Sequence, residues 1–372
     1  MNVLIDIAGA GALAYAAVTV PRNARKARVL RAEAKAKAPV NIDPARYGLV
    51  PAARLDSRFA GPDPEADAVA AAALAGDWRR AAGYLAAAGR DWDLRWYRLG
   101  ILVHAAAEDD AWVKAWRTAY PGDPSAALVH ADALVVLAGK VRGAKSAKHT
   151  TAEQFEGFHR LLAEALPACQ EAAWMAPEDP GPWVAQLTIA RGLGWSNDDF
   201  RALWAEVTAR DPHHFGAHAS ALQYWCAKWQ GSHELMYAFA ERAAASAPAG
   251  SLLPVLRLEA LMEHSFRDPQ APVYNQPFAQ AAVDATLDAV DRVPAGHHRL
   301  PAVRHLLADA LFRTERYAEA VEQFRAVGGY VGSAPWTYSA DPVKAFVFAR
   351  TNTFVAWEKA GRPAPGPRGG TR

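Results

Sequence analysis

Two short apolar runs with helical spacing, joined by a charged turn, constrain this chain more than any other feature. They lie within Pro301–Gly328, on either side of the turn Arg313-Thr314-Glu315-Arg316. Small side chains stand where two antiparallel helices must approach closely, at Ala308 and Ala320. The larger side chains of the seam are Leu307, Leu311, Tyr317 and Phe324. Such a pair of helices cannot bury its apolar face alone, so the pattern predicts stacked neighbours.

This unit resembles one copy of the tetratricopeptide repeat, and residues 68–89 resemble a second copy. In the second copy, the turn Gly76-Asp77-Trp78 precedes a run with the spacing of the second helix. The resemblance implies an all-α, right-handed solenoid of irregular helix pairs that binds a protein or peptide on its concave surface. Residues 228–240 also resemble part of an uncharacterised bacterial helical domain family. Trp229 in that stretch either lines a groove or packs beneath a turn.

Composition agrees with an all-α body. Hydrophobic residues make up 51% of the chain and charged residues 22%, which are typical values for a folded protein. Ala-rich runs favour helix because alanine loses no side-chain entropy there. Asp-Pro pairs that begin at Asp123, Asp179 and Asp211 each predict a helix start, since aspartate caps a helix and proline is tolerated at its first position. Cys169 and Cys226 lack C-x-x-C spacing and are expected to be buried thiols.

The N-terminal residues combine an apolar run with a basic flank. Val3–Val20 is long enough to span a bilayer, and seven Lys or Arg residues follow between Arg22 and Lys37. The positive-inside rule places everything after the run in the cytoplasm. Residues 1–22 are therefore predicted to be a single membrane anchor. A helix lying on the membrane surface and an ordinary packed helix are the alternatives.

The remaining residues divide into a linker, a body and a tail. Residues 23–60 are expected to form a charged stalk and a Pro-rich linker, or a segment lying against the body, because prolines break helices. Residues 61–360 are assigned to the helical repeat domain, and residues 361–372 are predicted to be disordered. Between the basic N-terminus and the tail, acidic residues outnumber basic ones, so no nucleic-acid binding is expected.

Two sets of residues are candidate sites. His214 and His218 are four residues apart, a spacing compatible with zinc ligation on one helix face, although no third ligand is evident. Their alternative role is as hydrogen-bonded histidines at a helix start. The candidate partner contacts are the aromatic residues Trp229, Tyr330, Trp336 and Tyr338. The last three lie in a Gly-rich loop that would otherwise cap the last hydrophobic face of the array.

Motifs that carry catalysis are missing from the sequence. It contains no P-loop, nucleophile elbow or dinucleotide-binding glycine pattern, so no catalytic residue is assigned and no cofactor is expected. The sequence favours an adaptor or scaffold that binds a protein or peptide partner, in the cytoplasm or at the cytoplasmic face of the membrane. The alternative is a hydrolase or small-ligand enzyme on a helical shell, with its site in the His213–His233 region.

Overall fold

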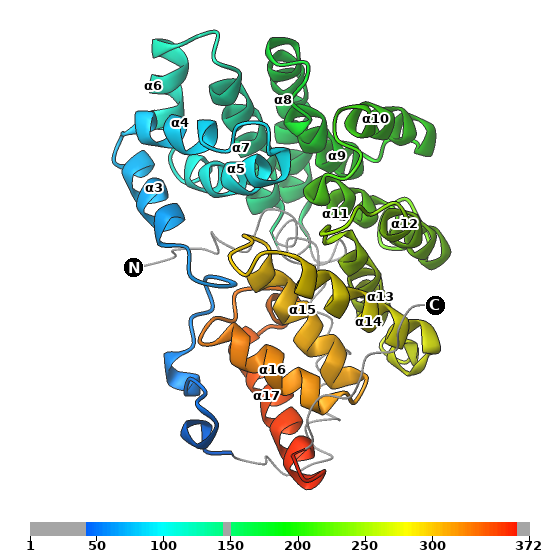
Figure 1. Ribbon diagram of the computed structural model, residues 1–372. Coiled ribbons are helices and arrows are strands. Elements are labelled where there is room, and N and C mark those ends of the chain that lie inside the picture. The colour runs from blue at the N-terminus through cyan, green and yellow to red at the C-terminus, as the bar shows by residue number, and fades with distance from the viewer. Residues whose placement is uncertain (1–41, 144–149, 363–372) are drawn as a thin grey trace. The chain divides into compact units, whose positions relative to one another are not determined.

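The computed structural model describes residues 42–143 and 150–362, and these residues are helical (Figure 1). They contain 15 α-helices and no β-strand, apart from an isolated β-bridge between Asp56 and Tyr330. The all-α prediction is therefore confirmed. The predicted anchor at 1–22, the stalk up to residue 41 and the tail from residue 363 lie outside the described residues.

The described residues form two compact units. Unit 2 comprises residues 63–143 and 150–236, and unit 1 comprises residues 42–62 and 237–362. Unit 1 is therefore built from two stretches of chain that are separated in sequence by all of unit 2. The boundary falls within helix α12, His233–Ala245.

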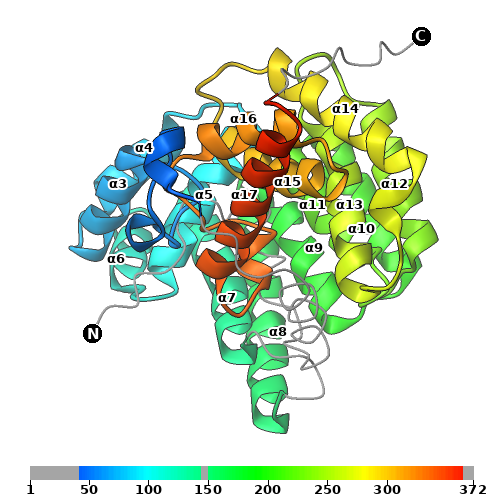
Figure 2. The same cartoon turned by 90° about the horizontal axis from the view of Figure 1, so that it is seen from below.

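In unit 2 the helices are ordered along the chain so that most consecutive ones contact each other. They are α3 (Pro64–Leu74), α4 (Trp78–Ala86), α5 (Trp92–Ala106), α6 (Ala111–Ala119), α7 (Pro124–Arg142), α8 (Ala152–Met175), α9 (Gly181–Leu193), α10 (Asn197–Arg210) and α11 (Phe215–Tyr224). Each odd-numbered helix from α3 to α9 contacts the next odd-numbered helix as well as the even-numbered helix that follows it. Figure 2 shows the longest pair, α7 and α8, side by side. The predicted second helix pair, residues 68–89, corresponds to α3 and α4.

Aspartate caps begin several of these helices. Asp63 accepts a hydrogen bond from the Ala66 N–H at 3.0 Å, and Asp123 accepts one from the Ser125 N–H at 2.8 Å. Asp179 accepts one from the Gly181 N–H, also at 2.8 Å. Each carboxylate satisfies an N–H that has no partner within its helix. The helix starts predicted at Asp123 and Asp179 are therefore confirmed.

The helix start predicted at Asp211 is wrong. Asp211 is the residue that ends α10, and its carboxylate accepts a hydrogen bond from the His213 N–H within the turn that follows. Helix α11 begins only at Phe215, where the His214 Nδ1 accepts a hydrogen bond from the Ala217 N–H at 3.0 Å. A histidine ring thus takes the capping role that the sequence pattern gave to the aspartate.

Unit 1 contains the helix pair from which the sequence analysis began. Its helices after α12 are α13 (Leu256–Arg267), α14 (Pro277–Arg292), α15 (Leu300–Arg313), α16 (Tyr317–Val327) and α17 (Pro342–Lys359). Helices α15 and α16 are the predicted pair, and Ala308 and Ala320 are fully buried where the two helices meet. Helix α15 also contacts α13 and α17.

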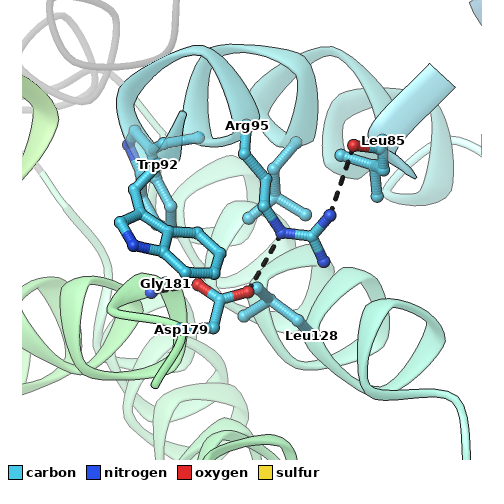
Figure 3. Close-up of a pocket in the computed structure, with 8 residues that line it drawn as sticks. Leu85, Trp92, Arg95, Leu128, Asp179 and Gly181 are labelled. Carbon is cyan, nitrogen blue, oxygen red and sulfur yellow. Dashed lines mark hydrogen bonds and ion pairs between the residues drawn. The ribbon is translucent and has the colours of Figure 1, made fainter. Parts of the chain in front are cut away.

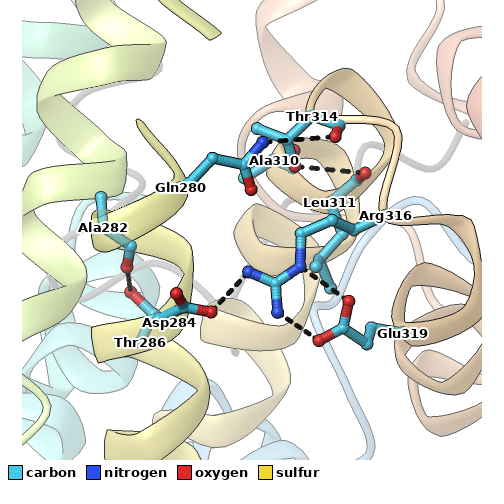
Figure 4. A network of polar contacts seen from close by, with 9 residues as sticks. All are labelled: Gln280, Ala282, Asp284, Thr286, Ala310, Leu311, Thr314, Arg316 and Glu319. Atoms are coloured by element: carbon cyan, nitrogen blue, oxygen red, sulfur yellow. Dashed lines mark hydrogen bonds and ion pairs between the residues drawn. The ribbon is translucent and has the colours of Figure 1, made fainter. Parts of the chain in front are cut away.

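Polar contacts fix the turn of this pair against the preceding helix (Figure 4). The Arg316 guanidinium binds the carboxylate of Asp284 on α14 and that of Glu319 on α16. The Thr314 hydroxyl donates to the Ala310 carbonyl at 2.7 Å, which closes the end of α15. Arg316 therefore joins α14 to α16 through one side chain.

Helix α7 is the one described helix that is long and apolar enough to cross a membrane. Its mean hydropathy over the best window is 1.3, and 56% of that window is buried inside the protein. Such burial is typical of a core helix, and α7 contacts α5, α8 and α9. Cys169 and Cys226 are buried thiols, as predicted.

Candidate partner-binding surface

Two aromatic side chains of unit 2 are largely exposed to solvent. Trp174, near the end of α8, is 83% exposed, and Tyr120, directly after α6, is 57% exposed. Trp and Tyr are the residue types that most often carry the binding energy of protein interfaces. These two residues mark the first candidate surface.

An ion pair brings the helices of these two aromatic residues together. Arg117 on α6 donates to both carboxylate oxygens of Glu171 on α8, at 3.0 and 3.1 Å. Tyr120 lies three residues after Arg117, and Trp174 lies three residues after Glu171. Helices α6 and α8 run in the same direction because α7 returns between them, so both aromatic residues lie one turn beyond the ion pair. We call Arg117, Tyr120, Glu171 and Trp174 the aromatic patch.

Buried rings support Tyr120 from below. Its ring meets the Trp78 ring edge-on, with centroids 5.6 Å apart. Trp78 stacks on Trp116 at 6.0 Å, and the Trp116 indole N–H donates to the Asp123 carboxylate at 2.9 Å. These rings fix the position of Tyr120. The Tyr120 side chain therefore loses little conformational entropy when a partner binds to it.

A groove lies where the end of α5 and the start of α6 meet α7. It has a volume of about 310 Å³ and is lined by residues 106–110, Val113, His130, Ala133, Leu134 and Leu137. Its base is apolar, and Glu108, Asp109 and Asp110 follow one another along its rim. We call it the acidic groove.

His130, which lines the acidic groove, is affected by charged residues of both the groove and the aromatic patch. The pKa of His130 is lowered by burial and by the nearby Arg117, while Asp110 and Glu171 oppose this shift. His130 is therefore neutral at pH 7 and lies among the charged groups of both features. Asp110 also pairs with Lys114, one turn before Arg117 on α6. The Arg117–Glu171 ion pair of the patch thus lies close enough to the groove for its charges to act on His130.

The acidic groove has the size and chemistry to hold one side chain of a protein partner. Its volume is at the lower end of the range of about 300–1,000 Å³ that is typical of ligand sites. The apolar base suits an aliphatic group, and the acidic rim favours a positive charge beside it. Among residues 42–143 and 150–362, no group of three or more His, Cys, Asp or Glu side chains is arranged to hold a metal ion.

A much smaller cavity lies in the row of odd-numbered helices in unit 2, between α5, α7 and the start of α9 (Figure 3). Its volume is about 10 Å³, which is barely the space of one water molecule. Arg95 crosses it and binds the Asp179 carboxylate at 3.0 Å, and it also donates to the Leu85 carbonyl and the Ser125 hydroxyl. Beyond this cavity, α5 contacts α11, where Trp96 lies against Gly216.

The two histidines predicted as metal ligands are buried in α11 and the turn before it. The His214 Nδ1 caps α11, as described above, and the His218 Nδ1 lies 3.0 Å from the His214 carbonyl. Burial lowers the pKa of His218 to about 4, so its ring is neutral at pH 7. These contacts match the alternative role of hydrogen-bonded histidines at a helix start.

The four aromatic residues predicted as partner contacts have different environments. Trp336 and Tyr338 are buried in unit 1, where the Trp336 indole donates to the His305 Nδ1 at 2.9 Å and the Tyr338 hydroxyl donates to Glu263 at 2.7 Å. Both are therefore removed from the set of surface contacts, because these hydrogen bonds and their burial make them core residues. Tyr330 is half-buried at the bridge to Asp56.

Trp229 lies in the turn between α11 and α12. Its ring is half-buried, and the Arg191 guanidinium lies 5.5 Å from the ring centroid. The adjacent Gly231 has no space for a side chain, because an added Cβ would lie 1.9 Å from the Trp225 carbonyl oxygen. Ser232 caps α12 by accepting a hydrogen bond from the Leu235 N–H at 3.2 Å. The turn and helix cap expected for this stretch are both present.

Unit 1 also buries two carboxyl groups on one face of α13. Glu259 and Glu263 are one turn apart, and the Glu259 Oε1 has no hydrogen-bond partner among the described residues. Burial raises the pKa of Glu259 to about 8, Glu263 adds to the shift, and Arg299 opposes it. Glu259 is therefore protonated at pH 7, and its neutral form is compatible with its position in the core.

This protonated carboxyl predicts an unusual pH dependence of stability. The pKa of Glu259 is above its ordinary value of 4.5 in the folded chain, so unfolding releases a proton between about pH 4.5 and pH 8. Stability should consequently fall as the pH rises through that window. The free energy of unfolding should fall by about 1.4 kcal/mol per pH unit where the dependence is steepest. Glu259→Gln removes this dependence, so the variant should be more stable than wild type at pH 8. Urea unfolding from pH 5 to pH 8 measures the effect.

An exposed glutamate provides the control for this measurement. Glu241 is paired with Arg257 at the surface, so Glu241→Gln should leave the pH profile close to that of wild type. Parallel profiles for wild type and Glu259→Gln would show that Glu259 does not retain a proton in the folded chain.

The fold and this surface define an all-α protein built of helix pairs, with an exposed aromatic patch next to an acidic groove. Comparison with protein-family models, curated proteins and solved structures found no match to this chain.

Sequence reasoning missed the aromatic patch, although the sequence contained a signal for it. Along α8 the buried side chains include Leu161, Ala165, Cys169 and Ala172, which recur at helical spacing. Trp174 falls outside that stripe and shares a face with Glu171. A tryptophan on the charged face of an amphipathic helix is the pattern that would have identified it.

Proposed function

We propose that this protein is an adaptor or scaffold whose tetratricopeptide-like array binds a protein partner through the aromatic patch and the acidic groove. The single observation that carries the proposal is the 83% exposure of Trp174, one turn beyond the Glu171–Arg117 ion pair, whose charges act on His130 in a groove of about 310 Å³. Trp, Tyr and Arg are the residues enriched at binding hot spots, and here they lie together on one surface.

The packing order of the helices supports an array of the tetratricopeptide kind. In such an array, the first helix of each pair contacts the first helix of the next pair, and the second helices form the other layer. The contacts from α3 to α11 in unit 2, and from α13 to α17 in unit 1, follow this order for the odd-numbered helices. We infer a solenoid of irregular pairs within each unit.

The features of the groove determine the chemistry of the proposed partner. A partner segment that fits would insert an aliphatic side chain between Val113 and Leu134 and carry Lys or Arg residues facing Glu108 and Asp109. An amphipathic basic helix has both features. We assign binding to this surface instead of the packed odd-numbered row, where the cavity measures only about 10 Å³.

A membrane location is part of the same proposal. The apolar run Val3–Val20 and its basic flank support an anchor that holds the adaptor at the cytoplasmic face. Fractionation of the full chain and of a chain lacking residues 3–20 tests this part separately. Recovery of both chains in the soluble fraction at low salt would eliminate the anchor.

Trp174→Ser is expected to abolish partner capture without loss of stability. Removing an exposed side chain changes the free energy of unfolding by no more than about 0.5 kcal/mol, whereas losing a hot-spot tryptophan weakens binding by at least about tenfold. The measurement is quantitative mass spectrometry of proteins captured from the source cell by the immobilised full chain.

Phe278→Ser is the matched control for this experiment. Phe278 on α14 is also an exposed aromatic residue, at 46%, but it belongs to unit 1 and not to the unit that contains the aromatic patch and the acidic groove. The control should retain the proteins that Trp174→Ser loses. Equal capture by both variants and by the wild-type chain would eliminate the aromatic patch as the binding surface.

A further inference from the structure

The N-terminal segment of unit 1 lies on the helices of that unit as a bound peptide would lie. The segment, residues 47–62, is called the strap. Its backbone pairs with the loop after α16: the Asp56 N–H donates to the Gly329 carbonyl and the Val331 N–H donates to the Asp56 carbonyl, both at 2.8 Å. The Gly332 N–H then donates to the Phe59 carbonyl at 2.8 Å. This is the main-chain pairing by which extended peptides add to a protein.

Two buried side chains bind strap carbonyls. The His305 ring on α15 donates to the Ala60 carbonyl at 2.9 Å, and the Arg350 guanidinium on α17 donates to the Val50 carbonyl at 2.9 Å. Because the Trp336 indole can only donate, the His305 Nδ1 accepts from it and the proton of His305 is on Nε2, facing the strap. Burial lowers the pKa of His305 to about 4, so this arrangement persists at neutral pH.

The groove selects small residues where the strap crosses α15. A Cβ added to Gly61 would lie 2.7 Å from the Pro301 Cβ, closer than real Cβ atoms approach. Ala60, the preceding residue, is 2% exposed. The groove thus has space for Ala-Gly at this point and for no larger pair.

Backbone hydrogen bonds are a large part of what holds the strap. Within residues 47–62 the buried apolar side chains are those of Leu49 and Ala60, and those of Tyr47, Val50, Leu55 and Phe59 are half-buried. The Tyr47 ring meets the Phe354 ring of α17 edge-on, with centroids 4.9 Å apart. The strap is also remote in sequence from the helices that it contacts, since Ala60 and His305 are 245 positions apart. An element with few buried apolar contacts and backbone pairing at the surface belongs to the low-stability part of a structure.

We propose that this face of unit 1 is a recognition groove for an extended peptide, and that the strap is its built-in occupant. A protein partner replaces the strap by presenting a segment of the same chemistry, an acidic residue followed four residues later by Ala-Gly-Pro, as in Asp56–Pro62. The carbonyl contacts of His305 and Arg350 are available to any such backbone. This groove is separate from the aromatic patch.

A peptide-binding experiment on the full chain tests the proposal. The probe is a fluorescein-labelled synthetic peptide of residues 45–62, and the readout is fluorescence anisotropy. Gly61→Val in the full chain displaces the strap by collision with Pro301, so this variant should bind the peptide at least about tenfold more tightly than the wild-type chain does. A peptide that itself carries Gly61→Val should fail to bind either chain.

Two outcomes would overturn the proposal. One is a folded Gly61→Val chain that binds the two peptides equally. The other is a stable dimer of the wild-type chain in light scattering that dissociates in the Gly61→Val variant, because a second copy would then supply the strap. Trp174→Ser should leave peptide binding unchanged, so the adaptor proposal and this one fail separately.

Hydrogen exchange of the wild-type chain tests the strap without a variant. The amides of Asp56, Val331 and Gly332 should exchange well before those in the middle of α15 and α17, because the strap opens while the helices remain folded. If these three amides exchange only together with the helices, the strap is a permanent part of the core and the proposal is wrong.

Discussion

Replacing Trp336 with alanine is expected to lower the free energy of unfolding by about 3–5 kcal/mol, the usual cost of deleting a buried tryptophan. The Trp336 ring is 3% exposed and packs against Phe324 of α16 and Phe346 of α17, with centroids 6.2 and 5.5 Å away. Its indole N–H also donates to His305, whose ring holds the strap. Urea unfolding followed by circular dichroism measures the loss.

Two further variants separate the contributions of Trp336. Trp336→Phe keeps most of the buried ring but removes the N–H, so it should cost about 1–3 kcal/mol for the unsatisfied His305 nitrogen. Tyr330→Ala, at a half-buried position of the same loop, should cost less than Trp336→Ala. A Trp336→Ala chain as stable as the wild type would contradict the core role and return Trp336 to the set of surface contacts.

Replacing Asp179 with alanine is expected to destabilise unit 2 by about 3 kcal/mol or more. The change leaves the Arg95 guanidinium almost buried without its carboxylate, and breaking one partner of a buried ion pair typically costs about 3–5 kcal/mol. It also removes the acceptor for the Gly181 N–H at the start of α9. The side chains of this pair are 13% and 8% exposed, so solvent screens them little. The shift in urea midpoint measures the effect.

An exposed ion pair of the same unit gives the comparison. Asp198 pairs with Arg201 at 2.8 Å on α10, but its side chain is 94% exposed, so Asp198→Ala should change stability by less than about 1 kcal/mol. The double variant Arg95→Met with Asp179→Leu should recover much of the loss, because it leaves no charge buried. Equal effects of Asp179→Ala and Asp198→Ala would show that the Arg95–Asp179 contact does not hold α5 to α9.

The helical content of this chain could be predicted from local patterns, and the long-range contacts could not. Ala308 and Ala320 predicted the close approach of α15 and α16, because small side chains at these positions allow the backbones of two helices to come close together. The pattern failed at Asp211, where two successive histidines allowed the ring of His214 to cap the helix instead. Local spacing cannot determine which of several neighbouring polar groups accepts the hydrogen bond.

The candidate site depended on the burial of aromatic residues, which local sequence patterns determine poorly. Trp336 and Tyr338 lie in a Gly-rich loop, a setting typical of exposed residues. In the structure both are buried, and they donate hydrogen bonds to His305 and Glu263, which are remote in sequence. Trp174 lies in an ordinary helix and is exposed. Residues 42–62, expected as a linker or as a segment against the body, contact α15 and α17 through carbonyls that no side-chain pattern reveals.

A photo-crosslinking amino acid at position 174 of the full chain tests the central claim most directly. The account predicts that irradiation of living source cells joins position 174 to another protein, while the same amino acid at position 278 gives no such product. Equal crosslinking at both positions, or none at position 174, would contradict the claim that the aromatic patch is the surface through which this protein binds its partner.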